Sequence, residues 1–262
     1  MQIAALTIFP EMFDLFWSHG IVRRAIEQQI VSAAAVNIRD FALDKHHVTD
    51  DRPYGGGCGM VMKPEPLAGA IRAARGKAPG ARTILMTPQG RVFTQAVAAE
   101  LAVLPGLILV CGRYEGVDDR LCEELIDEEV SIGDYVLTGG ELPAMVVIDA
   151  VTRLIPGALG GEDSAARDSF SAGRLEHAHY TRPPVFEASE VPGVLLTGHH
   201  RNIERWRLAS SLLRTFVNRP DLLRDRPLTD AEAEVLRGWH ADIARLLGDE
   251  PAASAGPEKG QR

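Results

Sequence analysis

Apolar stretches of strand length alternate with longer amphipathic stretches through the first 157 residues. We predict strands at the short apolar runs, residues 2–9, 33–43, 81–88, 106–112 and 128–137. We predict helices where apolar positions recur at helical spacing, at residues 10–28, 63–75, 94–104, 117–126 and 141–155. The strands are apolar throughout rather than alternately polar, which is typical of a parallel sheet covered on both faces. The pattern therefore predicts an α/β domain around a mostly parallel sheet over residues 1–157.

The pattern changes after residue 157. Residues 158–173 are rich in Gly, Ala, Ser and Asp and lack apolar periodicity, so we predict a flexible interdomain linker or lid. Residues 174–248 have a helical pattern and predict a small helical domain, in which Thr229 and Glu232 form a capping box at the start of the last helix. Residues 249–262 are polar, and we expect a disordered tail.

Composition limits the cellular setting and the partners. The chain has 45% hydrophobic and 24% charged residues, and we find neither a signal peptide nor an apolar run long enough to cross a bilayer. Three scattered cysteines fit a reducing, cytoplasmic location rather than a disulfide framework. The net charge of −8 argues against a nucleic-acid partner, but nine arginines and six acidic residues lie between Arg174 and Arg226. A basic C-terminal segment on an acidic body remains compatible with RNA.

Three loops that follow predicted strands carry glycine and polar residues. They are "TPQGRVF" at 87–93, "CGRYEGVDDR" at 111–120 and "IGDYVLTGGELP" at 132–143. Ligands of open parallel sheets bind at the carboxyl ends of the strands, so we expect the three loops to form one pocket. None matches the phosphate-binding P-loop, and the first strand leads into "FPEMF" rather than a G-x-G-x-x-G turn. An ordinary dinucleotide or Rossmann methyltransferase site is therefore disfavoured.

These loops closely resemble motifs of the bacterial tRNA (guanine-N(1)-)-methyltransferase family, TrmD, of the SPOUT superfamily. The matching stretches are "LTIFPEMF", "RPYGGGCGMVM", "TPQG", "GRYEGVDDR", "SIGDYVLTGGELPA", "DAVTRLIPG", "HYTRP" and "RWR", in this order over about the first 245 residues. The resemblance implies a SPOUT fold with a deep C-terminal trefoil knot, which the periodicity alone does not predict. It also implies a homodimer with the active site at the subunit interface. The implied reaction methylates ring nitrogen 1 of the guanosine immediately 3′ of the tRNA anticodon.

The implied methyl donor is S-adenosylmethionine, held in a bent form by the three loops. By resemblance, the cofactor-binding residues are Thr87, Pro88, Gly90, Gly112, Tyr114, Gly116, Ser131, Ile132, Gly133, Tyr135, Leu137, Gly139, Gly140 and Pro143. Backbone amides and carbonyls read a neutral purine edge well, and glycine lets the backbone approach it closely. The resemblance also implies a need for magnesium, but no carboxylate cluster in the sequence dictates a site for Mg²⁺.

Asp168 and Arg153 match catalytic positions of the family, and Glu115 is a third catalytic candidate. Asp168 in "ARDSF" is the implied general base, because ring nitrogen 1 carries a proton that must leave as the methyl arrives. Arg153 is the implied residue that stabilises the negative charge developing on the exocyclic oxygen of guanine. Glu115 is expected to contact the base or the sulfonium end of the cofactor. On sequence alone, Asp168 and Glu115 also fit solvated acids, and Arg153 fits a favourable cation at a helix C-terminus.

The C-terminal region offers candidates for RNA contact. They are His179, Tyr180, Arg182, His199, Arg201, Arg205 and Arg207. A solvated basic helix face is the alternative for the arginines. His199 stands in "GHH" where the family commonly has an asparagine, which changes one candidate RNA contact but not the chemistry.

Two other functions remain open from the sequence. One is a catalytically idle RNA-binding adaptor with the same fold, although an idle copy has no chemical need for Asp168, Arg153 and Glu115 together. The other is an enzyme that acts on a different RNA or on a ribose hydroxyl. Ribose methylation does not need an acceptor for a ring proton, so Asp168 favours the guanine enzyme.

Overall fold

A computed structural model of the chain describes residues 1–161 and 164–248. It divides into two compact units, Met1–Ala165 and Ala166–Arg262, which are described separately below. The predicted tail at 249–262 and linker residues 162–163 lie outside the described residues. None of the described helices combines the length and the apolarity that crossing a bilayer requires.

The first unit is built on a five-stranded parallel sheet with strand order β2-β1-β6-β5-β7. The strands are β1 (Gln2–Thr7), β2 (Ser32–Asn37), β5 (Arg82–Val92), β6 (Gly106–Cys111) and β7 (Glu128–Ser131). Every residue of the central strand β6 is buried, as its continuous apolar sequence predicts. The predicted α/β class with a mostly parallel sheet is confirmed.

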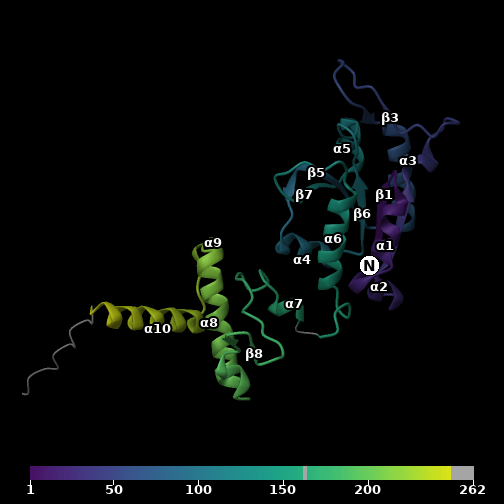
Figure 1. Cartoon of the computed structure of the whole chain (residues 1–262). Coiled ribbons are helices and arrows are strands. Elements are labelled where there is room, and N and C mark those ends of the chain that lie inside the picture. Colours follow the sequence, from purple (N-terminus) through teal and green to yellow (C-terminus); the bar gives the residue numbers. More distant parts are fainter. Residues whose placement is uncertain (162–163, 249–262) are drawn as a thin grey trace, which may run out of the picture. The chain divides into compact units, whose positions relative to one another are not determined.

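Helices cover both faces of this sheet (Figure 1). One core layer packs α2 (Gly20–Glu27), α4 (Gln95–Ala102) and α6 (Glu141–Leu154) against Leu107, Leu109 and Cys111 of β6. The other packs α3 (Pro64–Lys77) and α5 (Asp119–Leu125) against Ile108 and Val110. Successive residues of β6 thus supply opposite layers, because side chains alternate across a strand.

Local chemistry sets several helix ends. The Thr94 side chain accepts a hydrogen bond from Val97 N at the start of α4, and Asp118 accepts one from Arg120 N at the start of α5. Pro64 occupies the first turn of α3, where its missing N–H costs nothing.

Several predicted boundaries were wrong. The strand expected at 128–137 ends at Ser131, and the one expected at 33–43 gives way after Asn37 to the 3-10 helix η2 (Ile38–Phe41). The strand expected at 81–88 instead continues to Val92 through an irregularity between Met86 and Arg91. The helix expected at 10–28 is divided into η1 (Pro10–Phe13), α1 (Asp14–Trp17) and α2.

Two short strands, β3 (Asp50–Asp51) and β4 (Val61–Met62), pair antiparallel beside the glycine-rich segment 55–59. Backbone hydrogen bonds connect β4 to the loop after β6: Met62 N donates to Gly116 O at 2.9 Å, and Asp118 N donates to Met62 O at 3.1 Å. The segment that contains Glu115 is therefore held from the N-terminal half of the unit.

The second unit contains mostly helices and one small hairpin. Its described elements, with α7 starting just before the division, are α7 (Ser164–Arg167), β8 (Val185–Phe186), β9 (Ser189–Glu190), η3 (Gly193–Leu196), α8 (His200–Asn218), α9 (Asp221–Arg224) and α10 (Asp230–Leu247). The predicted capping box of Thr229 and Glu232 is confirmed at the start of α10. Glu232 is buried and also bonds Arg174 at 2.9 Å and Arg226 at 2.8 Å. These ion pairs connect Arg174, near the start of the second unit, and Arg226 to the first turn of α10.

Candidate functional site

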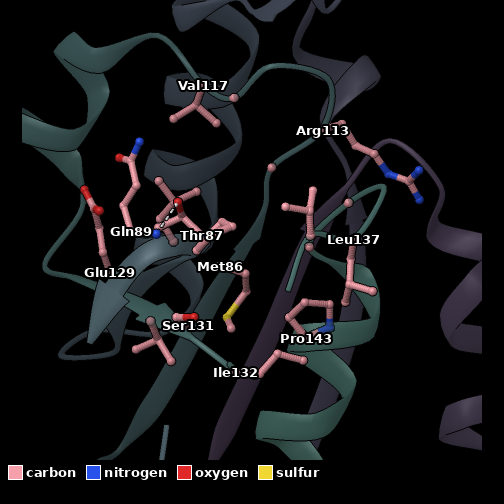
Figure 2. A pocket seen from close by; sticks show the side chains of 18 of the residues that line it. Met86, Thr87, Gln89, Arg113, Val117, Glu129, Ser131, Ile132, Leu137 and Pro143 are labelled. Carbon is pink, nitrogen blue, oxygen red and sulfur yellow. Dashed lines mark hydrogen bonds between the residues drawn. The ribbon is translucent and has the colours of Figure 1, made fainter. Parts of the chain in front are cut away.

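A pocket of about 420 Å³ lies at the carboxyl ends of β6 and β7 and beside the irregular part of β5, where residues 85–89 line it. It is lined by the three loops that the sequence placed together, and by Pro143 from the first turn of α6 (Figure 2). The volume falls in the range that small-molecule and cofactor sites occupy, roughly 300–1,000 Å³. Parallel strands that end at one edge explain why segments far apart in the sequence meet here.

The structure brings almost all the predicted cofactor residues to this pocket. The predicted cofactor residues that line it are Thr87, Pro88, Gly112, Tyr114, Gly116, Ser131, Ile132, Gly133, Tyr135, Leu137, Gly139, Gly140 and Pro143. The predicted catalytic residue Glu115 lines it too. Gly90 is not a lining residue. A Cβ at Gly90 would lie 2.3 Å from Glu129 C and Val130 N, so its glycine allows β5 to approach β7.

Close packing of two loops forms one wall of the pocket. Gly140 N donates to Gly112 O at 2.9 Å, and Gly139 pairs with Arg113 as an isolated antiparallel bridge. A Cβ at Gly140 would lie 2.7 Å from Cys111 Cα and 3.0 Å from Gly112 N. Because these neighbours are backbone atoms, only glycine allows the loops this separation.

The buried carboxylate of Glu141 holds the same two loops through hydrogen bonds outside the cavity. Glu141, the first residue of α6, has a side chain 1% exposed and accepts hydrogen bonds from Arg113 Nε at 2.9 Å and Thr7 Oγ1 at 2.8 Å. The Arg113 guanidinium also donates to Thr138 O at 3.3 Å and lies 4.7 Å from the centre of the Phe9 ring. In Figure 2 it points away from the centre of the pocket. Arg113 therefore holds the wall through contacts outside the cavity.

The segment after β7 is a compact turn rather than a strand. Gly133 N donates to Ser131 Oγ at 3.2 Å, Tyr135 N donates to Gly133 O at 2.9 Å, and Tyr135 Oη donates to Ile132 O at 3.3 Å. Gly133 has a φ of 143°, a conformation that glycine adopts readily. Residues 131–133 and 135–137 of this segment line the pocket.

The loop after β6 presents Glu115 and Tyr114 to the pocket, and both side chains are exposed at the surface. Glu115 N donates to Met60 O at 3.0 Å, and its side chain lies over Gly59, where a Cβ would clash with it. Partial burial of the hydroxyl end, with Asp50 nearby, raises the pKa of the Tyr114 hydroxyl. Tyr114 therefore stays protonated at neutral pH and is not a general base in this state.

Cysteine nucleophiles do not contribute chemistry to the pocket. All three cysteines are free. Burial raises the pKa of the Cys122 thiol to about 11 and that of the Cys111 thiol well above its usual range. Both are therefore protonated thiols near neutral pH, and the thiolate is the reactive form.

Two predicted catalytic residues are absent from the pocket lining in the described structure. Arg153 lies in the last turn of α6, on the helix face that also carries the exposed Leu142, Val146 and Asp149. Asp168 directly follows α7 in the second unit, where its carbonyl oxygen accepts a hydrogen bond from Ser171 N at 3.3 Å. The pocket and Asp168 thus belong to different units.

The predicted RNA-contacting residues lie in the second unit. His179, Tyr180, Arg182, His199, Arg201 and Arg205 are exposed, and Arg207 is half-buried. Arg207 Nη1 bonds Glu204 at 2.7 Å, and Arg205 Nη2 lies 3.7 Å from Glu234. The Tyr180 and Trp206 rings lie 6.0 Å apart between centroids. The acidic partners reduce the positive charge that Arg205 and Arg207 present.

The sequence prediction missed several pocket residues. Gln89 and Glu129 line the cavity, on the opposite side from Arg113 in Figure 2, and Asp119 lines it as well. Gln89 and Asp119 lie in two of the loops predicted to form the pocket but are not among the predicted cofactor-binding residues, whereas Glu129 lies in a predicted strand outside those loops. The available signal for Glu129 was position, because it lies within a few residues of the predicted loop 132–143.

Comparison with known proteins gives a consistent result. A family model described as "tRNA (Guanine-1)-methyltransferase TrmD" matches residues 1–225. A tRNA (guanine-N(1)-)-methyltransferase of Desulfatibacillum aliphaticivorans is 57% identical over 94% of this chain and 94% of its own. Proteins with the same name from Geotalea uraniireducens and Staphylococcus carnosus are 52% and 50% identical, over 95% and 93% of this chain and 100% and 99% of their own.

Proposed function

The chain belongs to the tRNA (guanine-1)-methyltransferase family, and we propose that the pocket holds S-adenosylmethionine beside the guanine that the enzyme methylates. The activity is methyl transfer to ring nitrogen 1 of a guanine in tRNA. The observation that carries the proposal is the pocket itself: every predicted cofactor residue except Gly90 lines this single cavity. We further propose that the target is the guanosine immediately 3′ of the anticodon.

The residues present suit this cofactor. The lining residues of 131–137 and the turn at Gly139–Gly140 would offer backbone amides and carbonyls to a purine edge, and Gly116 adds no side chain to the cavity. Glu115 and Glu129 supply negative charge at the lining, which favours a sulfonium cation. When bound, S-adenosylmethionine supplies the methyl group as an electrophile. The chain's own residues bind and orient the cofactor and accept the proton of guanine ring nitrogen 1.

We propose Asp168 as the general base. Ring nitrogen 1 of guanine is a poor nucleophile while it carries its proton, so a carboxylate within hydrogen-bond reach must accept that proton as the new bond forms. Such proton transfer contributes typically about 10²–10⁴-fold to a rate. The target base must also leave the anticodon stack to reach a pocket of this kind.

Arg153 and Glu115 complete the proposed catalytic set. As the proton leaves, negative charge develops on the exocyclic oxygen of guanine, and a fixed guanidinium stabilises it. Glu115 lines the pocket from the loop after β6, where its carboxylate can meet the base or the cofactor.

We propose that two copies of the chain form each active site. The exposed face of α6 carries Leu142, Val146 and Arg153 in one line, which supports burial of this face by a second copy. Asp168 of one subunit would then meet the pocket of the other, and the second unit would bind tRNA through its exposed basic and aromatic residues. A tRNA substrate also favours the cytoplasm as the location.

A trefoil knot in a SPOUT fold is the proposed topology of the pocket region. The support is local: the segment 132–140 lies directly against the loop that follows β6, through the Gly140–Gly112 hydrogen bond and the Arg113–Gly139 bridge. Such close backbone contact suits a segment that is threaded through a loop.

The possible metal ligands among the described residues do not suit Mg²⁺. The one group there with three suitable ligands is Glu176, His177 and His179. Mg²⁺ prefers carboxylate and water oxygens in octahedral geometry, whereas two of these ligands are imidazoles. The described residues therefore give Mg²⁺ no assigned role in the proposed reaction.

A direct test uses purified protein, S-adenosylmethionine labelled in its methyl group, and two tRNA transcripts. One transcript carries guanosine immediately 3′ of the anticodon and the other carries adenosine there. We expect label only in the first transcript, at ring nitrogen 1. Label in neither transcript, with the cofactor still bound, would overturn the proposed substrate and leave the pocket assignment standing.

A further inference from the structure

Three potential metal ligands meet in the segment before the β8–β9 hairpin. The ligand atoms of Glu176, His177 and His179 all lie within 4.8 Å of one another. His179 Nε2 lies 3.0 Å from Glu176 Oε1, and the two imidazole rings lie 4.4 Å apart between centroids. Ligand atoms bound about 2.0–2.1 Å from one tetrahedral ion lie roughly 3.3 Å apart, so the cluster needs little movement to enclose an ion.

The tautomer of His177 suits metal binding. Its Nδ1 lies 2.9 Å from the carbonyl oxygen of Ala178. A carbonyl only accepts hydrogen bonds, so Nδ1 carries a proton, and in the neutral imidazole Nε2 then has a free lone pair. Metal-ligating histidines usually donate their other ring N–H in this way, which fixes the ring orientation and raises the basicity of the ligating nitrogen.

Hydrogen bonds to neighbouring elements fix the backbone of the cluster. Glu176 N donates to Ser169 Oγ at 3.0 Å, and Ala178 N donates to Ser210 Oγ of α8 at 3.0 Å. Both backbone polar groups of Leu175 are hydrogen-bonded to α8. Its N–H donates to Thr215 Oγ1 at 3.0 Å, and its carbonyl oxygen accepts from Ser211 Oγ at 2.5 Å. A backbone ordered before the ion arrives lowers the entropy lost on binding.

From this geometry we propose that Glu176, His177 and His179 form a site for one divalent transition-metal ion of the zinc class. Two imidazoles and one carboxylate suit Zn²⁺ or Co²⁺, with water as the fourth ligand. Such a water has room, because the His179 side chain is 63% exposed. The bound ion would fix the ring of His179 immediately before Tyr180, in the segment proposed to contact tRNA.

The competing explanation is a simple ion pair between Glu176 and His179. That pair does not need His177, and it requires a protonated imidazole, whereas a metal ligand must be neutral. The two explanations therefore differ in the role of His177. Only the metal site predicts that His177 controls the affinity for an ion.

The test is a Co²⁺ titration of the untagged full-length protein in a Cys58→Ser background, which removes an exposed thiol ligand. We expect one Co²⁺ per chain, with the strong visible absorption of four-coordinate cobalt, displaced by Zn²⁺ but not by Mg²⁺. His177→Gln and Glu176→Gln should each weaken Co²⁺ binding at least about tenfold. His240→Gln, which removes an exposed imidazole from α10 in the same unit, should leave the affinity unchanged.

A second readout locates the ion. The Trp206 ring lies 6.3 Å from the His177 ring between centroids, so bound Co²⁺ should quench its fluorescence. Trp206→Phe should abolish the saturable quenching and retain the cobalt absorption. Absence of saturable Co²⁺ binding, or equal loss of affinity in His177→Gln and His240→Gln, would overturn the proposal. Neither readout requires methyl transfer, so the result is independent of the proposed function.

Discussion

Arg113 Nε donates to Glu141 Oε2 at 2.9 Å, which joins the loop after β6 to the first residue of α6. The carboxylate is buried, and its second oxygen accepts from Thr7 at the end of β1. Its position at a helix N-terminus also favours negative charge. One acid therefore connects two segments of the pocket wall, the loop after β6 and the start of α6, to the end of β1 through contacts that lie outside the cavity.

Glu141→Gln should loosen this wall. The substitution leaves the Arg113 guanidinium without its counter-charge in a mostly buried position, so we expect a loss of about 3 kcal/mol in unfolding free energy and weaker binding of S-adenosylmethionine. Denaturant unfolding and calorimetric titration measure the two effects. Glu100→Gln is the matched control, since it removes an acid from the exposed ion pair with Arg91 and should change little. Equal effects of the two substitutions would refute the role of Glu141.

Gly140→Ala should impair cofactor binding by a different route. The new Cβ would meet the backbone of Cys111 and Gly112, and we expect a destabilisation of about 1–3 kcal/mol together with reduced affinity for S-adenosylmethionine. Gly238→Ala, inside α10, provides the control. Its Cβ would meet nothing within 4 Å, so it should stabilise the protein by up to about 1 kcal/mol. Normal cofactor binding by Gly140→Ala would contradict the proposed close approach of the loops.

Glu232 should make the second unit sensitive to acid. Hydrogen bonds from Arg226, and from the backbone and side chain of Thr229, lower the pKa of Glu232 from its ordinary 4.5 to about 2. Because the folded-state pKa is the lower one, its stabilisation is present above pH 4.5 and is lost as the pH falls toward about 2. The full contribution is on the order of 3 kcal/mol.

Denaturant unfolding of the wild type and Glu232→Gln at pH 7, 4.5 and 3 measures this contribution. The difference in stability between the two proteins should be largest at pH 7 and should shrink below pH 4.5. Asp225→Asn, which alters an exposed acid of the same unit, should show no such trend. A difference between wild type and Glu232→Gln that does not depend on pH would argue against a charged role for Glu232.

Much of the fold could be predicted because hydrophobic pattern and burial agree. The continuous apolar run 106–112 predicts a central strand, and β6 is buried on both faces. The strand predicted at 128–137 ends at Ser131, because Ser131, Gly133 and Tyr135 bond to one another within a turn. Such local hydrogen bonds compete with strand pairing and leave no periodic signal.

The pocket could be predicted where its loops follow strands. Hydrogen bonds between residues far apart in the sequence could not be predicted. Thr7 and Glu141 are 134 residues apart, and an acid in a first helical turn is usually solvated. Burial of Glu141 becomes visible only when β1, the loop after β6 and α6 are assembled. Likewise, the environment of His177 depends on α8, which lies well beyond it in the chain.

The central claim, that Asp168 accepts the proton of guanine nitrogen 1, is tested most directly by single-turnover methyl transfer with Asp168→Ala. The substrate is a tRNA transcript with guanosine immediately 3′ of the anticodon, and binding of S-adenosylmethionine is measured in parallel. We expect the rate to fall by about 10²–10⁴-fold while cofactor affinity is retained, with Asp225→Ala behaving as wild type. A variant that binds the cofactor normally and transfers methyl at the wild-type rate would contradict the mechanism.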